Sequence, residues 1–180
     1  MTAVAALLQR SGRRILLATF AVAAIGSLLV PEPFAFGQTS ADESSPIFGV
    51  KIPAGYRQWE LIAPSREAGS FDELRSILGN AISMKAYRDS ALPFPDGSIL
   101  VKLAWKQVPS AEFAEAFVPG HTTTVQVMVK DSKKYPSTGG WGFGRFIDGK
   151  PVDETQHQTC FACHEANVKE HDFVFTRYAP

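Results

Sequence analysis

The chain has 180 residues and no formal net charge, because 18 Lys and Arg residues balance 18 Asp and Glu residues. A balanced charge predicts no surface for nucleic acid and no strongly acidic or basic partner. The apolar content is ordinary for a folded domain, and the sequence shows no internal repeat. Composition therefore excludes a nucleic-acid partner, and the function has to be inferred from particular segments of the sequence.

The N-terminus has the order of a secretory signal peptide. Three arginines between residues 10 and 14 precede the apolar run 15–30, and small residues follow at 34–37. The alternative is an uncleaved membrane anchor, but Pro31 ends the run before it reaches the roughly 20 residues needed to span a bilayer. We therefore expect residues 1–37 to be removed and the mature protein to be periplasmic, without a membrane attachment.

The part that follows is large enough for one compact domain. Residues 38–47 are mostly small and polar, which predicts a flexible lead. Residues 48–180 then form the folded domain, and the mature chain of about 140 residues is too short for two.

A helix is predicted from Phe71 to about Asp89. Ser70 and Glu73 match the S-x-x-E capping box at its start, and apolar residues recur at helical spacing after them. Prolines and the Asp96-Gly97 pair then end this unit in a turn.

Strands follow, because the apolar period changes from helical to alternating. Residues 98–106 place Leu100, Lys102, Ala104 and Lys106 on one face and more apolar residues on the other. Similar patterns predict strands at residues 122–130, 141–147 and 173–178. The expected fold class is therefore α+β, mainly an antiparallel β-sheet with a few helices.

The only two cysteines of the chain form one motif, Cys160-Phe161-Ala162-Cys163-His164. This spacing is typical of c-type haem attachment, with two thioethers to the porphyrin and the adjacent histidine on the iron. A thioredoxin-like redox pair would instead follow an early strand and open a long helix, and only sixteen residues follow His164. The sequence thus predicts a covalently attached haem c with Cys160, Cys163 and His164 as its binding residues.

A second strong axial ligand is not evident. No methionine follows the motif, and the mature chain offers only Met84 and Met128, which suit core positions. The remaining histidines are expected in solvated loops; they are His121, His157 and His171. We therefore expect a five-coordinate iron whose open side binds or converts a small molecule, rather than a plain electron carrier.

Several segments, taken in their order along the chain, resemble the cytochrome P-460 family over nearly the whole mature domain. They are 53–59 (PAGYRQW), 75–80 (RSILGN), 94–97 (FPDG), 128–131 (MVKD), 139–143 (GGWGF) and 160–164 (CFACH). The resemblance implies an antiparallel sheet protein, usually a homodimer, with one pentacoordinate c-type haem. P-460 enzymes oxidise hydroxylamine and carry a bond from a lysine to a porphyrin meso carbon. The similar cytochromes c′-beta lack that bond and bind nitric oxide or carbon monoxide behind an apolar cap.

The resemblance therefore implies two functions. The first is oxidation of hydroxylamine, with nitric oxide as a candidate second substrate and with electrons passed to a soluble acceptor cytochrome. The second is nitric oxide binding or scavenging without a lysine cross-link. Lys102, central in its strand, is the expected catalytic and cross-linking lysine, with Lys106 and then Lys85 as alternatives.

Two further features of the expected site concern proton transfer and positive charge. Hydroxylamine oxidation needs a proton acceptor near the iron, and segment 141–146 carries Gly142 and Gly144 at positions that would otherwise offer a cavity-facing side chain. Arg57, Arg75 and Arg145 are candidates to pair with haem propionates or to steer an anion.

Overall fold

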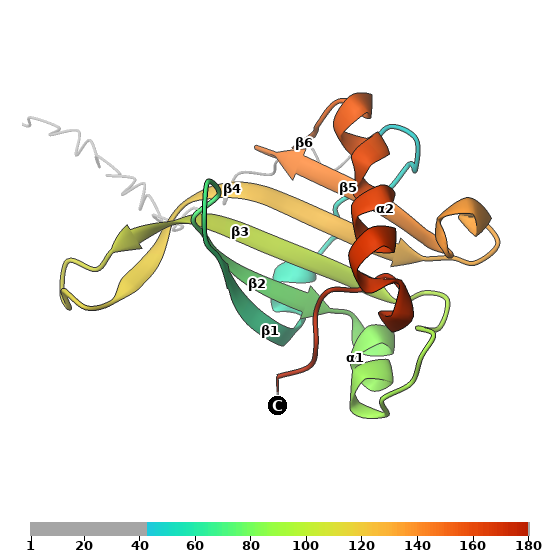
Figure 1. The fold of residues 1–180 in the computed structure, drawn as a ribbon, viewed down its shortest axis with the longest axis horizontal. Coiled ribbons are helices and arrows are strands. Elements are labelled where there is room, and N and C mark those ends of the chain that lie inside the picture. Colours follow the sequence, from blue (N-terminus) through green and yellow to red (C-terminus); the bar gives the residue numbers. More distant parts are fainter. Residues whose placement is uncertain (1–42, 180) are drawn as a thin grey trace, which may run out of the picture. The chain divides into compact units, whose positions relative to one another are not determined.

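A computed structural model describes residues 43–179. Its core is one six-stranded antiparallel sheet whose strands lie side by side in chain order (Figure 1). The strands are β1 (Glu60–Glu67), β2 (Glu73–Gly79), β3 (Ile99–Pro109), β4 (Phe117–Lys130), β5 (Trp141–Ile147) and β6 (Lys150–Pro151). The predicted α+β class is confirmed, and so is the strand at residues 141–147.

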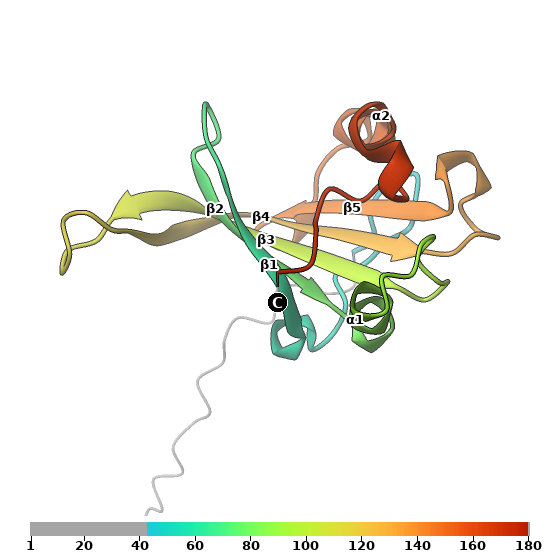
Figure 2. The ribbon, with the colours of Figure 1, turned by 60° about the horizontal axis from the view of Figure 1, so that its bottom comes forward.

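Two α-helices and three short 3-10 helices complete the fold. Helix α2 runs across one face of the sheet, whereas α1 lies on the other side at the end of β2 (Figure 2). The helices are η1 (Tyr56–Gln58), α1 (Ala81–Arg88), η2 (Pro136–Thr138), α2 (Glu154–Val168) and η3 (Lys169–His171).

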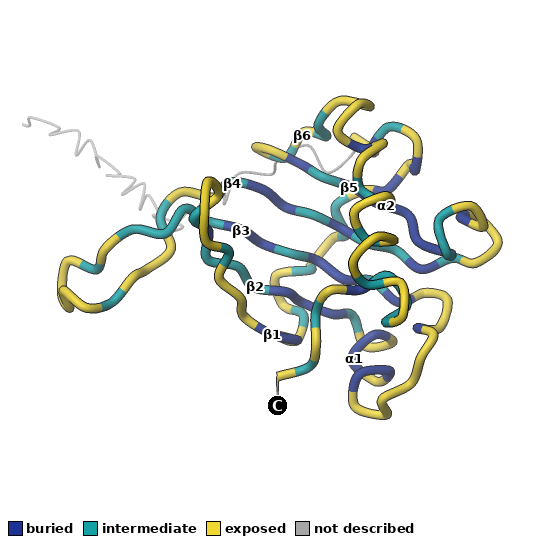
Figure 3. Tube along the Cα trace, viewed as in Figure 1, coloured by how far each residue is buried: buried dark blue, intermediate teal, exposed yellow. Residues whose placement is uncertain are grey.

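The middle of β3 is buried on both of its faces (Figure 3). Val101 and Leu103 are buried on one face, and Leu100 and Ala104 are buried on the other. Alternation along β3 therefore does not separate a core face from a solvent face. The second face is covered because α2 and the C-terminal segment lie over it, and this is the face that carries Lys102.

The far ends of β3 and β4 form a hairpin arm, residues 107–119, that projects beyond the other strands (Figure 1). Phe113 and Phe117 on this arm expose more than half of their surface, and Val118 is also exposed. The arm contributes little to the core and presents an apolar surface.

The predicted helix at residues 71–89 is wrong over its first half. Residues Glu73–Gly79 form β2, and α1 begins after Asn80, whose side chain accepts a hydrogen bond from the Ser83 amide at 3.0 Å. The expected capping box does not form, because the Glu73 carboxylate instead accepts hydrogen bonds from Arg75. The segment E-L-R-S-I-L-G fits a period of two as well as a helical period, and pairing with both β1 and β3 decides between them.

The predicted strand at residues 173–178 is also wrong. This segment follows η3 and pairs with no strand of the described sheet. Its carbonyls are used by side chains instead: His164 bonds to Phe173, Arg177 to Val174, and Tyr87 to Thr176. A chain whose backbone groups are bound by side chains in this way needs no strand partner.

The expected lead at residues 38–47 is described only from residue 43. Within it, Ser45 is buried, and its hydroxyl donates to the Phe143 carbonyl at 2.8 Å. The expected signal peptide, residues 1–37, lies outside the described residues. No helix within residues 43–179 is long and apolar enough to cross a bilayer.

Candidate functional site

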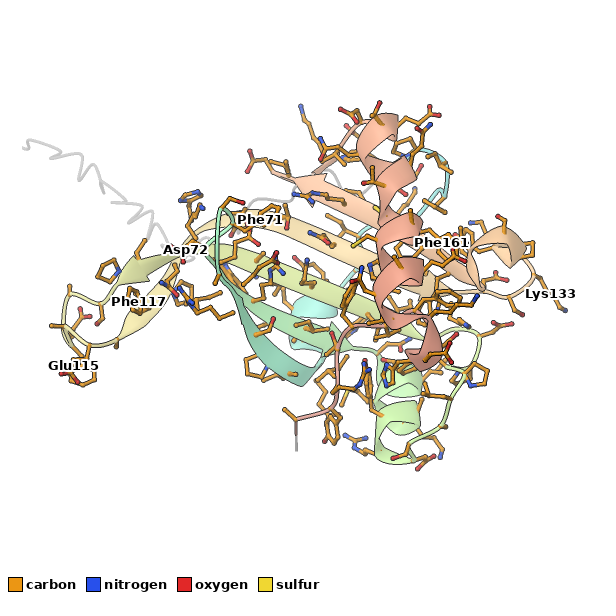
Figure 4. All side chains as sticks on the ribbon, in the orientation of Figure 1. Phe71, Asp72, Glu115, Phe117, Lys133 and Phe161 are labelled. Carbon is orange, nitrogen blue, oxygen red and sulfur yellow. The ribbon has the colours of Figure 1, made fainter. Side chains whose placement is uncertain are left out.

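A cavity of about 670 Å³ lies between the sheet and α2. Its volume is in the range of sites that hold drug-sized ligands and cofactors. In Figure 4, the label Phe71 marks the β1–β2 turn at one side of the sheet and the label Phe161 marks α2. The lining comes from every strand except β6, from α2 and from the C-terminal segment; it includes Ser65, Glu67, Phe71, Glu73, Arg75, Ile77, Leu100, Lys102, Gln126, Met128, Phe143, Arg145, Cys160, Cys163, His164, Val174 and Phe175.

Helix α2 presents the predicted haem motif to this cavity. Cys160 stands three residues before Cys163 and four before His164, so all three side chains lie on one side of the helix. Both cysteines are free thiols. Burial raises the pKa of the Cys160 thiol, which keeps it protonated at neutral pH. The structure therefore brings the three motif residues together at one cavity.

His157, one turn before the motif, docks α2 on the sheet. Its Nε2 accepts the Arg145 backbone amide of β5 at 3.1 Å, so Nδ1 carries the proton and donates to the Asp153 carbonyl at 2.9 Å. The ring is fully buried. The expectation of a solvated loop histidine is therefore wrong for His157. Only the spacing of three residues from Cys160 hinted at a role on the same helix.

His164 is held by its second ring nitrogen. Its Nδ1–H donates to the Phe173 carbonyl at 2.7 Å. The ring centroids of Phe143 and Phe175 lie 5.0 and 4.9 Å from the centroid of the His164 ring. Burial lowers the pKa of His164, which favours the neutral imidazole. Nε2 then carries no proton and has a free electron pair, as a metal-ligating histidine requires.

Lys102 faces the same cavity from the middle of β3. The strand register places it beside Ile77 on β2 and Gln126 on β4, and Gln126 in turn pairs with Arg145 on β5. Burial, and to a smaller extent the positive charge of Arg75, lowers the pKa of Lys102 to about 8. A larger share of this amine is therefore neutral near pH 7 than for an exposed lysine.

The two alternative lysines lie elsewhere. The Lys106 ammonium donates to the Phe71 carbonyl at the β1–β2 turn. Lys85 pairs with Asp89 on the exposed side of α1. Neither lysine lines the cavity, so the geometry selects Lys102.

Two carboxylates, Glu67 and Glu73, line the cavity, although neither was predicted from the sequence as a site residue. Glu73 on β2 accepts from Arg75 and, at 2.5 Å, from the Thr123 hydroxyl, while Glu67 on β1 forms an ion pair with Arg75. A side chain at Gly142 would meet the Tyr135 ring. One at Gly144 would meet Phe146 and Val50, so neither glycine marks a missing cavity group. Glu73 was not predicted as a site residue because the sequence pattern assigned it to the capping box of a helix at 71–89. No sequence pattern indicated Glu67.

Few of the other candidate axial ligands reach the cavity. His121 is exposed on β4, and His171 bonds to the Val174 carbonyl beside η3. Met84 is buried in the core, as expected, whereas Met128 lines the cavity. Within residues 43–179, His164 is the only histidine of the cavity lining.

The residues present fit a haem. Two thiols and a neutral imidazole stand on one wall, and an apolar strip formed by Leu100, Met128 and Phe143 lies along the sheet. Arg75 and Arg145 supply positive charge, and the buried Nε of Arg145 has no hydrogen-bond partner. A carboxylate such as a haem propionate would satisfy it. Arg57 is exposed beside Tyr56 and does not reach the cavity.

Comparison with protein families agrees with this geometry. The model of the family described as Cytochrome P460 matches residues 53–176, which include all elements of the cavity. The chain belongs to the cytochrome P460 family. Cytochrome P460 proteins are haem proteins, so a haem cofactor is implied for this chain. A search of curated proteins found no match.

The depressed pKa of Lys102 predicts a pH-dependent cost in the haem-free protein. Between pH 8 and 10.5 the unfolded chain binds more protons than the folded one, so burial of Lys102 costs stability below about pH 8 and this cost disappears as pH rises. In a Cys160→Ser, Cys163→Ser background, Lys102→Met should raise the free energy of unfolding by about 2–3 kcal/mol at pH 7 and by little at pH 10.5. Urea denaturation measures both values.

The matched control is Lys85→Met, which removes an exposed lysine and should show no such trend. An equal gain from Lys102→Met at both pH values would contradict the burial of a charged amine in this cavity.

Proposed function

We propose that this cytochrome P460 protein is exported, holds haem c through Cys160 and Cys163 with His164 as the axial ligand, and oxidises hydroxylamine at the open side of the iron. Lys102 forms the additional bond to the porphyrin edge. The observation that carries the proposal is that one cavity contains the attachment motif on α2 and the Lys102 amine on β3.

The amine of Lys102 has the properties that such a bond requires. It is buried, its pKa is lowered to about 8, and the opposite wall of the cavity carries the two thiols. Bond formation replaces one N–H and one C–H by a C–N bond, which releases two protons and two electrons. A peroxide-class oxidant must take up those electrons, and the neutral share of the amine supplies the lone pair.

When bound, the haem iron would supply the redox centre and the open coordination position. This chain must then accept the protons that hydroxylamine oxidation releases. Glu67 suits that task better than Glu73: its side chain is 37% exposed, whereas that of Glu73 is 6% exposed. Both carboxylates pair with Arg75, but Glu73 also accepts from the Thr123 hydroxyl, so the more exposed Glu67 is the carboxylate through which a proton can leave to solvent.

The proposed activity is tested with purified haem-loaded protein, hydroxylamine and an artificial electron acceptor. We expect acceptor reduction that depends on hydroxylamine. Glu67→Gln should slow it by about 100-fold or more, within the range for loss of a general base, while the absorption spectrum stays unchanged. Glu60→Gln, also on β1 but in a surface pair with Arg88, is the control and should leave the rate unchanged. Absence of turnover in the unsubstituted protein would contradict the proposal.

Nitric oxide binding to an unmodified haem is the second candidate function. Phe71 lines the cavity at the β1–β2 turn, away from α2, where it supplies an apolar wall of the kind that favours an uncharged diatomic ligand. Protein that binds nitric oxide but does not turn over hydroxylamine would favour this function.

We also propose a location and partners for the protein. The N-terminal pattern supports export to the periplasm, where a soluble cytochrome would accept the electrons. A homodimer is proposed as well, and the exposed Phe113 and Phe117 of the hairpin arm offer apolar surface that a second copy would cover.

A further inference from the structure

The carbonyl that orients His164 belongs to an unusual turn. Asp172 and Phe173 follow one another with φ angles of 48° and 62°, a left-handed conformation that residues with a side chain rarely adopt. The Phe173 carbonyl accepts the His164 Nδ1–H at 2.7 Å. The position of this turn therefore decides how the imidazole is rotated and how strongly its Nδ1–H is bonded.

A buried ion pair holds the side chain of Asp172. The Lys130 ammonium, at the end of β4, lies 2.7 and 2.9 Å from the two carboxylate oxygens, and the two side chains are only 6% and 8% exposed. The backbone amide of Phe94 donates to the same carboxylate at 2.8 Å. Lys130 also donates to the Gly139 carbonyl at 2.9 Å. Three segments far apart in sequence thus meet at Asp172.

The backbone of the turn is held as well. The indole nitrogen of Trp141 donates to the Asp172 carbonyl at 2.8 Å. The Phe173 ring packs so closely on Gly139 that a Cβ there would lie 2.1 Å from its Cε2 atom. Side chain, carbonyl and neighbouring ring are therefore all fixed, which is how a strained backbone persists in a folded protein.

The segments involved are the ones that the sequence marked without a role. MVKD at 128–131 supplies Lys130, FPDG at 94–97 supplies the Phe94 amide, and GGWGF at 139–143 supplies Gly139 and Trp141. Lys130, Phe94, Gly139 and Trp141 contact the turn and do not line the cavity, whereas Met128 and Phe143 of the same segments do line it. Their contacts converge on two consecutive residues, Asp172 and Phe173, which gives these segments a role beyond packing.

We infer that Lys130 and Asp172 are positioning residues, which set the orientation and the Nδ1 hydrogen bond of the axial histidine through the Phe173 carbonyl. This inference rests on the proposed role of His164 as the iron ligand. A buried ion pair is weak as a source of stability, because desolvation offsets much of its attraction. An apolar pair would serve packing as well, whereas only a charged, multiply bonded carboxylate holds this turn at a defined distance from α2.

The expected effect on the iron has a defined sign. A strong bond from Nδ1–H to a carbonyl makes the imidazole a better electron donor to its metal. Loosening the turn weakens this bond. The iron–imidazole stretching frequency of the ferrous protein should then fall, and the midpoint potential of the haem should rise.

The test compares Lys130→Met with Val101→Ala in the haem-loaded protein. Val101 is fully buried in β3, does not line the cavity and takes no part in the hydrogen bonds that hold the turn, so its truncation is a control for general destabilisation of the fold. Resonance Raman spectra and redox titration should show the lower stretching frequency and the higher midpoint potential for Lys130→Met only. Unchanged values in folded Lys130→Met, or equal shifts in both variants, would overturn the inference.

Trp141→Phe provides a second, milder variant. It keeps an aromatic ring in the core and leaves the ion pair intact, but it removes the hydrogen bond to the Asp172 carbonyl. A smaller shift of the same sign is expected, and this variant decides the matter if Lys130→Met yields no haem-loaded protein. If the unsubstituted protein shows no iron–imidazole stretch, the iron is not five-coordinate with His164 as its ligand, and the proposed function itself fails.

Discussion

Replacing Lys102 by methionine is expected to return the ferrous absorption bands to the positions of an ordinary c-type haem. Methionine has a similar length and apolar character but no amine, so the cavity stays filled while the bond to the porphyrin cannot form. A substituent on a meso carbon perturbs the ring directly, and its loss should shift the main band by its full displacement rather than by a fraction. Optical spectra of the dithionite-reduced proteins measure this.

Lys106→Met is the matched control for this prediction. Lys106 lies on the same strand, but its ammonium donates to the Phe71 carbonyl and the residue does not line the cavity. Its replacement should leave the bands displaced. If Lys102→Met keeps the displaced bands, the cross-linking assignment is wrong. If the unsubstituted protein already has ordinary bands, nitric oxide binding becomes the preferred function.

Loss of both thiols should separate the haem from the polypeptide. In a Lys102→Met background, which removes the third proposed covalent bond, the Cys160→Ser, Cys163→Ser variant should release all of its haem into acidified acetone. The parent Lys102→Met protein should retain it, because thioether bonds survive the loss of tertiary structure. Haem absorbance in the organic and protein fractions gives the result directly.

His164→Ala in the same background distinguishes attachment from ligation. It keeps both thiols, so the haem should remain with the protein in acidified acetone. Its ferrous ligand field should nevertheless change, because the neutral Nε2 donor is gone. Complete extraction from the Lys102→Met parent would show that Cys160 and Cys163 do not hold the haem.

The sequence predicted the site better than it predicted the elements around it. Cys160, Cys163 and His164 are close in sequence and lie on one helix, so their spacing was enough to place them together. Local spacing was not enough to place Lys102 at the cavity. Alternation along β3 defined the face on which Lys102 lies, but it could not show that α2 covers that face. The covering depends on the docking of α2 by His157, a contact with β5 that no periodicity reveals.

The errors have a common physical cause. Segment 73–79 fits both a helical and an alternating period, and segment 173–178 alternates without being a strand. In both places the outcome depends on partners distant in sequence: β1 and β3 for the first, and the side chains of His164, Arg177 and Tyr87 for the second. Local propensity is a weak guide where such partners decide the structure.

The central claim is that Lys102 and the motif of α2 bind one haem, and tryptic mass spectrometry of the mature protein tests it most directly. A modified Lys102 blocks cleavage after that residue, and cleavage between Lys150 and Pro151 is disfavoured. The account therefore predicts one haem-linked species that joins Asp89–Lys106 to Phe146–Lys169. Recovery of Asp89–Lys102 as a free, unmodified peptide, with haem on Phe146–Lys169 alone, would contradict it.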